Sequence, residues 1–245
     1  MFVFLKERMN TIAQSTCTFT VDNCNLVDIH KNCVINSLVD YKHCVKSCFA
    51  SHVNFGCRIA VSDERDMLLE TGGGLRKAKS LLTGFQSPES GCPEAPILIC
   101  NVDILSNIDI PTLLRAYNPN EMGVVVVYPR ETQRYLVFDE THRLCGWTNI
   151  ATGDVRGPIA NTQYPIANTQ NLAFSGMQVL NPRIFEVMDE VVKEKGDKFS
   201  LIDLYLSIAE KEILRAFIPE NYRMMDVGKI NQLAEAEAFA ATLQL

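Results

Sequence analysis

Two uninterrupted apolar stretches constrain the fold of this 245-residue chain more than any other feature. Residues 97–100 read ILIC and residues 124–127 read VVVV, with no polar residue in either stretch. A strand that is apolar on both faces is typical of a parallel sheet covered by helices on both sides. Strand-like and helix-like segments alternate from residue 54 onward, so we expect a largely parallel α/β sheet over residues 54–245.

The composition is typical of a soluble globular protein and excludes two classes of partner. Hydrophobic residues make up 47% of the chain and charged residues 21%. A net charge of −6 argues against the backbone of a nucleic acid as a partner. No apolar run approaches the ~20 residues that span a bilayer, and the apolar start is too short for a signal peptide. We therefore expect a cytoplasmic protein that binds neither nucleic acid nor a membrane.

Two aspartates stand at the ends of predicted strands. Asp103 follows the apolar stretch at 97–100, and Asp226 ends a shorter strand-like segment near the far end of the chain. Ligands of open α/β folds bind at the carboxyl edge of the sheet, and Mg²⁺ is held there by one or two carboxylates together with phosphate and water oxygens. We predict that Asp103 and Asp226 bind one Mg²⁺, with their carboxyl groups roughly 4–8 Å apart. The alternative is that each aspartate caps the element that follows it.

A glycine-rich turn precedes a predicted helix over residues 75–82. The turn consists of Glu70, Thr71, Gly72, Gly73 and Gly74. Consecutive glycines allow backbone to approach a flat or charged ligand closely, and the start of a helix offers unpaired N–H groups. The turn is therefore a candidate for binding a flat or charged ligand, and the alternative is that it only joins two elements.

Six segments, in order along the chain, give the sequence a family resemblance. They are SDERDMLLETGGGL (62–75), PILICNVDIL (96–105), RYLVFDETHRLCGW (134–147), NLAFSGMQVLNPRIF (171–185), KFSLIDLYL (198–206) and MMDVGK (224–229). Together they resemble the sugar-1-phosphate nucleotidyltransferases of the mannose-1-phosphate guanylyltransferase and N-acetylmuramate-1-phosphate uridylyltransferase types. The resemblance extends over about three quarters of the chain, from residue 54 to residue 239.

The resemblance implies a Rossmann-like, three-layer fold with a mixed, mostly parallel sheet. It also implies an enzyme that joins a nucleoside triphosphate to a sugar 1-phosphate and releases pyrophosphate, with Mg²⁺ as cofactor. The roles it implies are nucleobase contact for Gly72 and Gly73, framing of the site for Asn101, Mg²⁺ binding for Asp103 and Asp226, and sugar contact for Ser175 and Gly176.

The start of the chain departs from the family pattern. The family opens with a strand and a G-x-G-T-R loop that wraps the triphosphate, followed by a P-K pair, whereas residues 1–55 contain no glycine and no proline. We therefore divide the chain into an aberrant or diverged segment (1–53), expected to pack poorly, and a nucleotidyltransferase-like domain (54–245). Residues 33–36 are the candidate for the family's second strand and residues 40–51 for the helix after it.

Activity is expected to be impaired, because the loop that wraps the triphosphate is missing. The alternative function is a non-catalytic remnant that binds nucleotides or sugar phosphates.

Two explanations of the unusual segment remain open. A truncated head, or one read in a shifted frame, explains the abrupt change in composition, and a diverged N-terminus with a role of its own is the alternative. A zinc site would be such a role, since the stretch is rich in ligands: His30, Cys33, His43, Cys44, Cys48, His52 and Cys57. Their even spread does not match the paired spacing of structural zinc sites, which favours the first explanation.

Overall fold

The computed structural model describes residues 2–5, 32–37, 58–64, 67–83, 95–101, 103–161, 166–227 and 233–243. The strands of its main sheet are β1 (Phe2–Leu5), β2 (Asn32–Ser37), β3 (Arg58–Asp63), β4 (Ile97–Asn101), β6 (Gly123–Tyr128), β7 (Arg134–Phe138), β8 (Leu144–Asn149), β9 (Asp154–Arg156), β10 (Gln170–Leu180) and β11 (Leu214–Phe217). A smaller sheet pairs β5 (Ile104–Ser106) with β12 (Met224–Asp226). The helices are α2 (Glu70–Lys77), α3 (Lys79–Thr83), α4 (Ile110–Ala116), α5 (Ile184–Lys195), α6 (Leu201–Ile208), α7 (Leu233–Thr242) and the 3₁₀ turn η2 (Pro158–Ala160).

The main sheet is mixed. Along the order β3-β2-β1-β4-β10-β6-β11, the strands β1 to β4 pair in parallel, as do β6 and β11. Strand β10 is antiparallel to both β4 and β6, so it alone among the described strands of this series runs against the others. The long β10 also pairs with β7 and so joins the β7–β8–β9 meander to the sheet.

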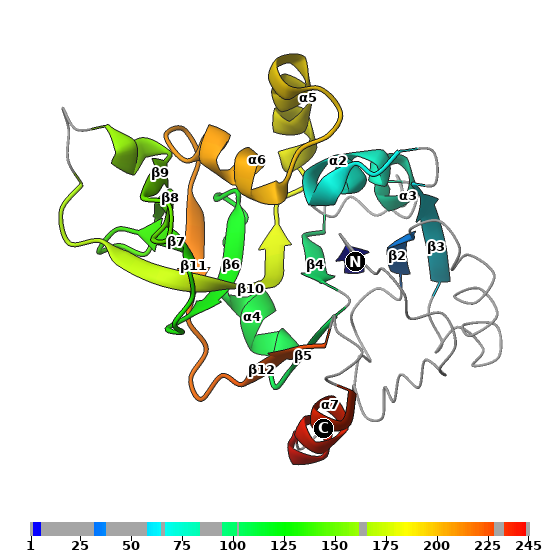
Figure 1. Ribbon diagram of the computed structural model, residues 1–245. Helices are drawn as coiled ribbons and strands as arrows, with labels where there is room; N and C mark the ends of the chain where they lie inside the picture. Colours follow the sequence, from blue (N-terminus) through cyan, green and yellow to red (C-terminus); the bar gives the residue numbers. More distant parts are fainter. Residues whose placement is uncertain are drawn as a thin grey trace.

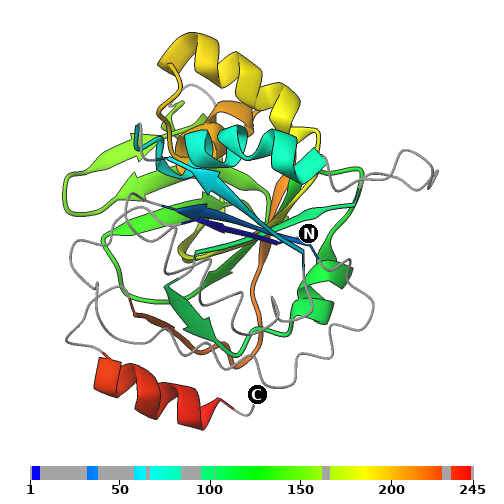
Figure 2. The ribbon, with the colours of Figure 1, turned by 90° about the vertical axis from the view of Figure 1, so that its right-hand side faces the viewer.

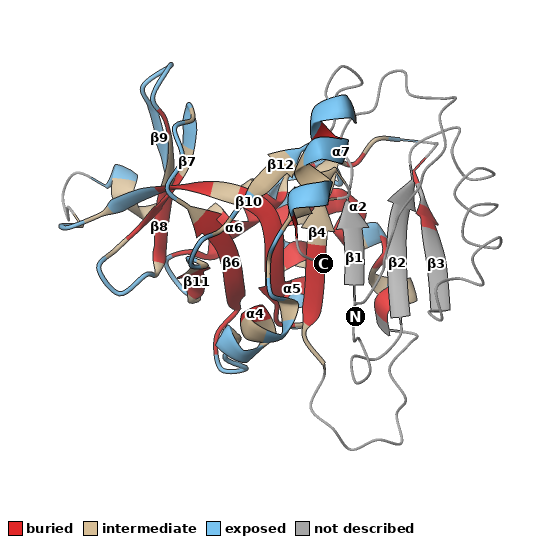
Figure 3. Ribbon diagram, turned by 90° about the horizontal axis from the view of Figure 1, so that it is seen from below, coloured by how far each residue is buried: buried red, intermediate tan, exposed pale blue. Residues whose placement is uncertain are grey.

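Helices cover both faces of this sheet (Figure 1, Figure 2). Helices α2, α3, α5 and α6 lie over one face, while α4, the β5–β12 pair and α7 lie on the other side. The larger core lies under α5 and α6, where Met188 and Tyr205 pack with strand residues such as Ile99. The smaller core packs Leu113 of α4 against Val126. Strands β4, β6 and β10 are accordingly buried along most of their length (Figure 3). The expected three-layer α/β fold is confirmed.

Two strands of the main sheet come from the first 53 residues. Strand β1 lies between β2 and β4, with Val3 opposite both Val34 and Ile99. The strand predicted at residues 33–36 is confirmed as part of β2, whereas the sequence had given no strand at residues 2–5. Thus two strands of the predicted aberrant segment belong to the sheet. The boundary at residues 53 and 54, the helix predicted at 40–51 and most of the candidate zinc ligands lie outside the described residues.

No helix within the described part of the chain is both long enough and apolar enough to cross a membrane.

Two of the described helices, α4 and α6, begin at capping residues that the sequence provides. Asp109 caps α4 by accepting from the Thr112 N–H at 3.2 Å, with Pro111 in the first turn. Ser200 caps α6 in a reciprocal capping box with Asp203.

An ion pair joins the start of β6 to the edge strand β11. The Arg215 Nε donates to both carboxylate oxygens of Glu121, at 3.1 and 2.8 Å, and its Nη1 donates to the Thr141 carbonyl at 2.8 Å. Glu121 is only 9% exposed. The hydrogen bonds from Arg215 lower the pKa of Glu121 below its ordinary value. The pair therefore stabilises the fold where Glu121 is ionised.

We predict that Glu121→Gln lowers the free energy of unfolding by ~1–3 kcal/mol near neutral pH, because Arg215 loses a charged partner. The folded-state pKa of Glu121 is lowered, so its contribution is complete above the unfolded-state pKa and is lost as the pH falls through the folded-state value. Urea unfolding from about pH 7 down to about pH 3 should show the two proteins converging at low pH.

The control is Glu190→Gln, which breaks an exposed pair with Lys193 and should change stability little. A difference between wild type and Glu121→Gln that stays constant down to about pH 3 would contradict the assignment.

Candidate functional site

The two aspartates predicted to bind Mg²⁺ lie side by side in the fold. In the β5–β12 pair Asp226 is opposite Ile104, and the Val227 N–H donates to the Asp103 carbonyl at 2.8 Å. Opposed Cα atoms lie ~4.5–5.5 Å apart and one strand step of ~3.4 Å is perpendicular to that direction, which places the Cα atoms of Asp103 and Asp226 roughly 5.5–6.5 Å apart. Two residues separated by 123 positions in the sequence thus lie next to each other at one end of the β5–β12 pair.

At this end of the β5–β12 pair both aspartates are at least partly accessible to solvent. Asp226 is exposed and Asp103 is half-buried. No group of three or more His, Cys, Asp or Glu residues that could hold a metal occurs in the described part of the chain. Two carboxylates nevertheless suit Mg²⁺, which commonly takes its remaining ligands from water and phosphate. The two carboxylates at the β5–β12 pair therefore fit an open Mg²⁺ site, with few protein ligands, and do not fit a site in which the protein supplies every ligand.

The predicted sugar-site residues also come together, across the β4–β10 pair. Met177 is opposite Cys100, and the pairing of β10 with β6 shifts register between Phe174 and Gln178. Gly176 lies in this bulge with φ +82°, and a Cβ there would lie only 2.8 Å from the Asn101 Nδ2. Gly176 is therefore the residue that allows Asn101 its position.

Ser175, to which the resemblance assigns contact with the sugar, is a buried residue. Its side chain is 1% exposed, and its Oγ has no hydrogen-bond partner among the described residues. Ser175 thus points into the protein, while its neighbour Gly176 lies against Asn101.

The glycine-rich segment corrects the predicted helix boundary. Helix α2 begins at Glu70 and ends at Lys77, so the three glycines lie within its first two turns rather than before it. The N–H groups of Gly72 and Gly73 both donate to the Phe199 carbonyl, at 2.9 and 3.1 Å. A Cβ at Gly73 would lie 2.2 Å from the Asp197 carbonyl oxygen. The close backbone approach that glycine permits is therefore used here by the protein's own chain, a long-range contact that no local pattern could reveal.

The first residues of α2 are held by polar contacts. Glu70 has φ +62°, a strained value for a residue with a side chain, and its carboxylate is 3.8 Å from the Lys198 Nζ. The Thr71 Oγ1 accepts from the Leu201 N–H at 3.0 Å. Glu64, which the sequence did not single out, accepts from the Leu69 N–H at 3.3 Å, and burial raises its pKa. Strain of this kind is concentrated at ligand-binding segments.

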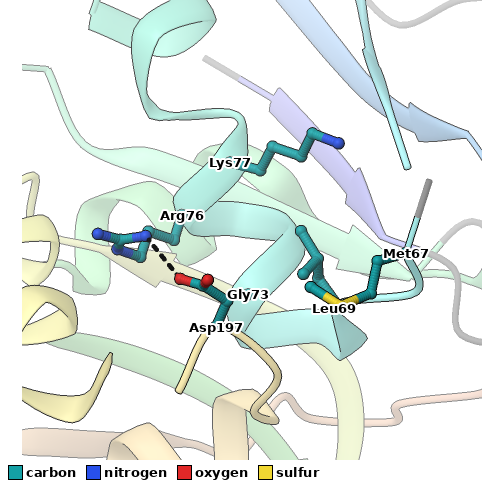
Figure 4. A pocket seen from close by; sticks show the side chains of 6 residues that line it. All are labelled: Met67, Leu69, Gly73, Arg76, Lys77 and Asp197. Atoms are coloured by element: carbon teal, nitrogen blue, oxygen red, sulfur yellow. Dashed lines mark hydrogen bonds and ion pairs between the residues drawn. The ribbon is translucent and has the colours of Figure 1, made fainter. Parts of the chain in front are cut away.

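A pocket of about 280 Å³ adjoins this helix (Figure 4). Its lining residues are Met67, Leu69, Gly73, Arg76, Lys77 and Asp197. The Arg76 guanidinium is paired with Asp197 at 3.2 Å and with Asp189 at 3.2 Å. None of these lining residues belongs to β5 or β12, so the pocket is separate from the two aspartates.

We predict that Gly73→Ala destabilises the protein by ~1–3 kcal/mol, measured by thermal or urea unfolding. Alanine gains up to ~1 kcal/mol of helix propensity over glycine, but its Cβ would clash with a backbone carbonyl that cannot rotate away. Glu194→Ala, on the exposed side of α5, is the surface-helix control. If Gly73→Ala were as stable as wild type or more stable, the prediction would be contradicted, because the Asp197–Phe199 segment would then move to accommodate the added Cβ.

The sequence matches no protein-family model and no curated protein. Solved structures, however, share its fold. A putative glucose-1-phosphate thymidylyltransferase from Bacillus anthracis is 13% identical with a TM-score of 0.63, and the match covers 88% of this chain and 78% of the other. A UDP-glucose pyrophosphorylase complexed with UDP-glucose is 15% identical with a TM-score of 0.58, over 86% and 81% of the two chains.

The inositol-1-phosphate CTP transferase of T. maritima is similar as well, at 12% identity and a TM-score of 0.56 over 87% and 77% of the chains. At these identities the comparison concerns the fold. The sequence motifs and the structural neighbours lead to one statement: this chain has the fold of the sugar-1-phosphate nucleotidyltransferases.

Proposed function

We propose that the chain binds a nucleoside triphosphate with Mg²⁺ and a sugar 1-phosphate, and that its reaction is nucleotidyl transfer with release of pyrophosphate. The observation that carries the proposal is the pairing of β5 with β12, which brings Asp103 and Asp226 to neighbouring positions. The structural neighbours named for such reactions support the reaction class.

In this proposal Asp103 and Asp226 hold the metal ion. Bound Mg²⁺ would supply positive charge to neutralise phosphate oxygens. The sugar phosphate attacks the α-phosphorus in line, and the protein contributes positioning and charge rather than a nucleophile of its own. Asn101, fixed by Gly176 at the end of β4, frames the position between the metal and the sugar.

The nucleobase is assigned to the start of α2, from Glu70 to Gly74. The Phe199 carbonyl already accepts from Gly72 and Gly73, so those two N–H groups are engaged within the protein. We therefore assign base contact to the backbone of Glu70 and Thr71, where the strained φ of Glu70 alters the direction of the chain. Gly72 and Gly73 would act by allowing the start of α2 to pack closely on the Asp197–Phe199 segment.

Catalysis by this chain should be slow. Residues 1–55 contain neither a glycine nor a proline, so they supply no G-x-G-T-R loop and no P-K pair for the triphosphate. Removing a single donor to developing charge costs ~10²–10³ in rate. The alternative function, a remnant that binds nucleotides or sugar phosphates without turnover, rests on the same observation. Cytoplasmic location remains an expectation from the sequence.

We predict Mg²⁺-dependent nucleotide binding that Asp103→Ala and Asp226→Ala each weaken at least about tenfold, because one of two carboxylates is lost. Calorimetry with GTP, UTP and CTP measures binding, and pyrophosphate release with a panel of sugar 1-phosphates measures turnover. Turnover should be far below ~1 s⁻¹, the low end for ordinary enzymes. Asp154→Ala, at an exposed strand remote from the site, is the control.

Turnover near 1 s⁻¹ that is abolished in Asp103→Ala would show that the first 53 residues provide a phosphate site after all. Binding of all three nucleotides that is equal with and without Mg²⁺ would refute the metal site.

We also predict that Gly176→Ala weakens sugar 1-phosphate binding by about tenfold or more, because its Cβ would displace the Asn101 side chain. Gly153→Ala is a matched control, since Gly153 also has a positive φ, +76°, but has no atom within 4 Å of the added Cβ. Both variants place an alanine at a positive φ, but only in Gly176→Ala does the added Cβ clash with the Asn101 side chain. Equal binding by the two variants would remove Asn101 from the proposed sugar site.

A further inference from the structure

Arg130 is an exposed arginine that the proposed reaction has not yet used. It follows the last residue of β6, Tyr128, by two positions. Its guanidinium carbon lies 5.4 Å from the centre of the Tyr128 ring, and no carboxylate of the described residues forms an ion pair with it. Its charge is therefore available to an anion. By contrast, carboxylates pair with Arg76, Arg115, Arg156, Arg183 and Arg215.

Arg130 lies at the carboxyl edge of the sheet, where β4 also ends. Strand β10 is antiparallel to both β4 and β6, so β4 and β6 run in the same direction. Their last residues are Asn101 and Tyr128, and β10 lies between the two strands. Two strand spacings correspond to about 10 Å across the sheet. Open α/β folds bind their ligands at this edge, so Arg130 is within reach of a ligand that contacts Asn101.

The side chain of Arg130 also lies on the face of the sheet that carries the two aspartates. Side chains alternate along a strand, so Tyr128 points to the same face as Val126, which packs in the smaller core with α4. The Tyr128 ring contacts the Tyr222 ring edge-on, with ring centroids 5.1 Å apart. Tyr222 leads directly into β12, which ends at Asp226. Tyr128 therefore holds the Arg130 guanidinium on the side of the β5–β12 pair.

The place of Arg130 relative to α2 indicates which phosphate it meets. Helix α2, to which the nucleobase is assigned, contacts β1, on the other side of β4 from β6 (Figure 1). Asp103 follows β4 and so lies between the two. A nucleotide that extends from α2 to the metal ion leaves the β6 side of the metal for the second substrate. That substrate is a phosphomonoester with about two negative charges, and the planar guanidinium binds phosphate with two parallel N–H···O bonds.

We propose that Arg130 binds the phosphate group of the sugar 1-phosphate, while the Tyr128 ring supports the guanidinium from below. Arg130 is thus a binding residue for the acceptor substrate, separate from the metal ion and the nucleobase contacts. The inference rests on the proposed function, because it takes the metal ion at Asp103 and Asp226 and the nucleobase at α2 as its reference points.

The test compares the binding of the two substrates. Arg130→Gln should weaken binding of glucose 1-phosphate and mannose 1-phosphate about tenfold or more, measured by phosphorus NMR titration, because a charged hydrogen-bond donor is lost. Arg130→Lys keeps the charge but not the paired donors, so its loss should be smaller. Binding of UTP or GTP with Mg²⁺, measured by calorimetry, should stay close to that of wild type in both variants. The affinity of wild type for the sugar phosphates should also fall more steeply with ionic strength than that of Arg130→Gln.

The control is Arg183→Gln, which removes the same charge at the opposite edge of the sheet. Arg183 follows the end of β10, whose last residue pairs with the first residues of β4 and β6, and its ion pair with Glu212 is long, at 3.7 Å. This variant should bind both substrates as wild type does. Urea unfolding should show little change in stability for either glutamine variant, since both arginines are exposed.

The possible results separate the inference from the proposed function. Unchanged sugar-phosphate binding in Arg130→Gln, equal losses in Arg130→Gln and Arg130→Lys, or an equal loss in Arg183→Gln would each overturn the role of Arg130 and leave the proposed function intact. A loss of nucleotide binding as large as the loss of sugar-phosphate binding would also overturn it, because Arg130 would then not be specific to the acceptor. A wild-type protein that binds no nucleotide with Mg²⁺ would overturn the proposed function and the inference with it. A wild-type protein that binds the nucleotide but no sugar 1-phosphate would overturn the inference and the acceptor half of the proposed function.

Discussion

The structure depends on the pairing of one antiparallel strand. Strand β10 bonds to β4 on one side and to β6 on the other, and farther along it bonds to β7. It therefore joins the parallel strands β1 to β4 to the parallel β6–β11 pair and to the meander. The bulge between Phe174 and Gln178 interrupts this pairing at one place. Bulges redirect side chains at sites of function, and this one places Gly176 against Asn101.

Close packing of backbone on backbone is the second constraint. The glycines of α2 bring that helix against the Asp197–Phe199 segment, where a single carbonyl accepts two N–H groups. Glycine lowers helix stability by up to ~1 kcal/mol per residue relative to alanine. Gly72 and Gly73 persist in a buried helix because an added Cβ would meet Phe199 at the first position and the Asp197 carbonyl oxygen at the second. The same residues that suggest ligand binding in the sequence are thus explained, in part, by the packing of the protein on itself.

The site combines stable and unsatisfied parts. Strands β4, β6 and β10 are buried along most of their length. Within the described residues, the side chains of Ser175, Gln178, Tyr205 and Tyr222 nevertheless have buried polar atoms with no hydrogen-bond partner. Local inconsistency of this kind tends to be concentrated where function competes with stability.

The sequence by itself determined the α/β class, the buried strands β4 and β6, and the two strand-end aspartates, because apolar runs and turn residues act locally. The motifs also predicted the nucleotidyltransferase fold that the structural neighbours share. Only the tertiary structure decided that β1 lies inside the sheet, that α2 begins at Glu70, and that the Phe199 carbonyl accepts from the glycine N–H groups. Each of these depends on contacts between residues about 96 to 130 positions apart. Such contacts leave no periodic signal in the sequence, since they arise from the shape of the assembled layers.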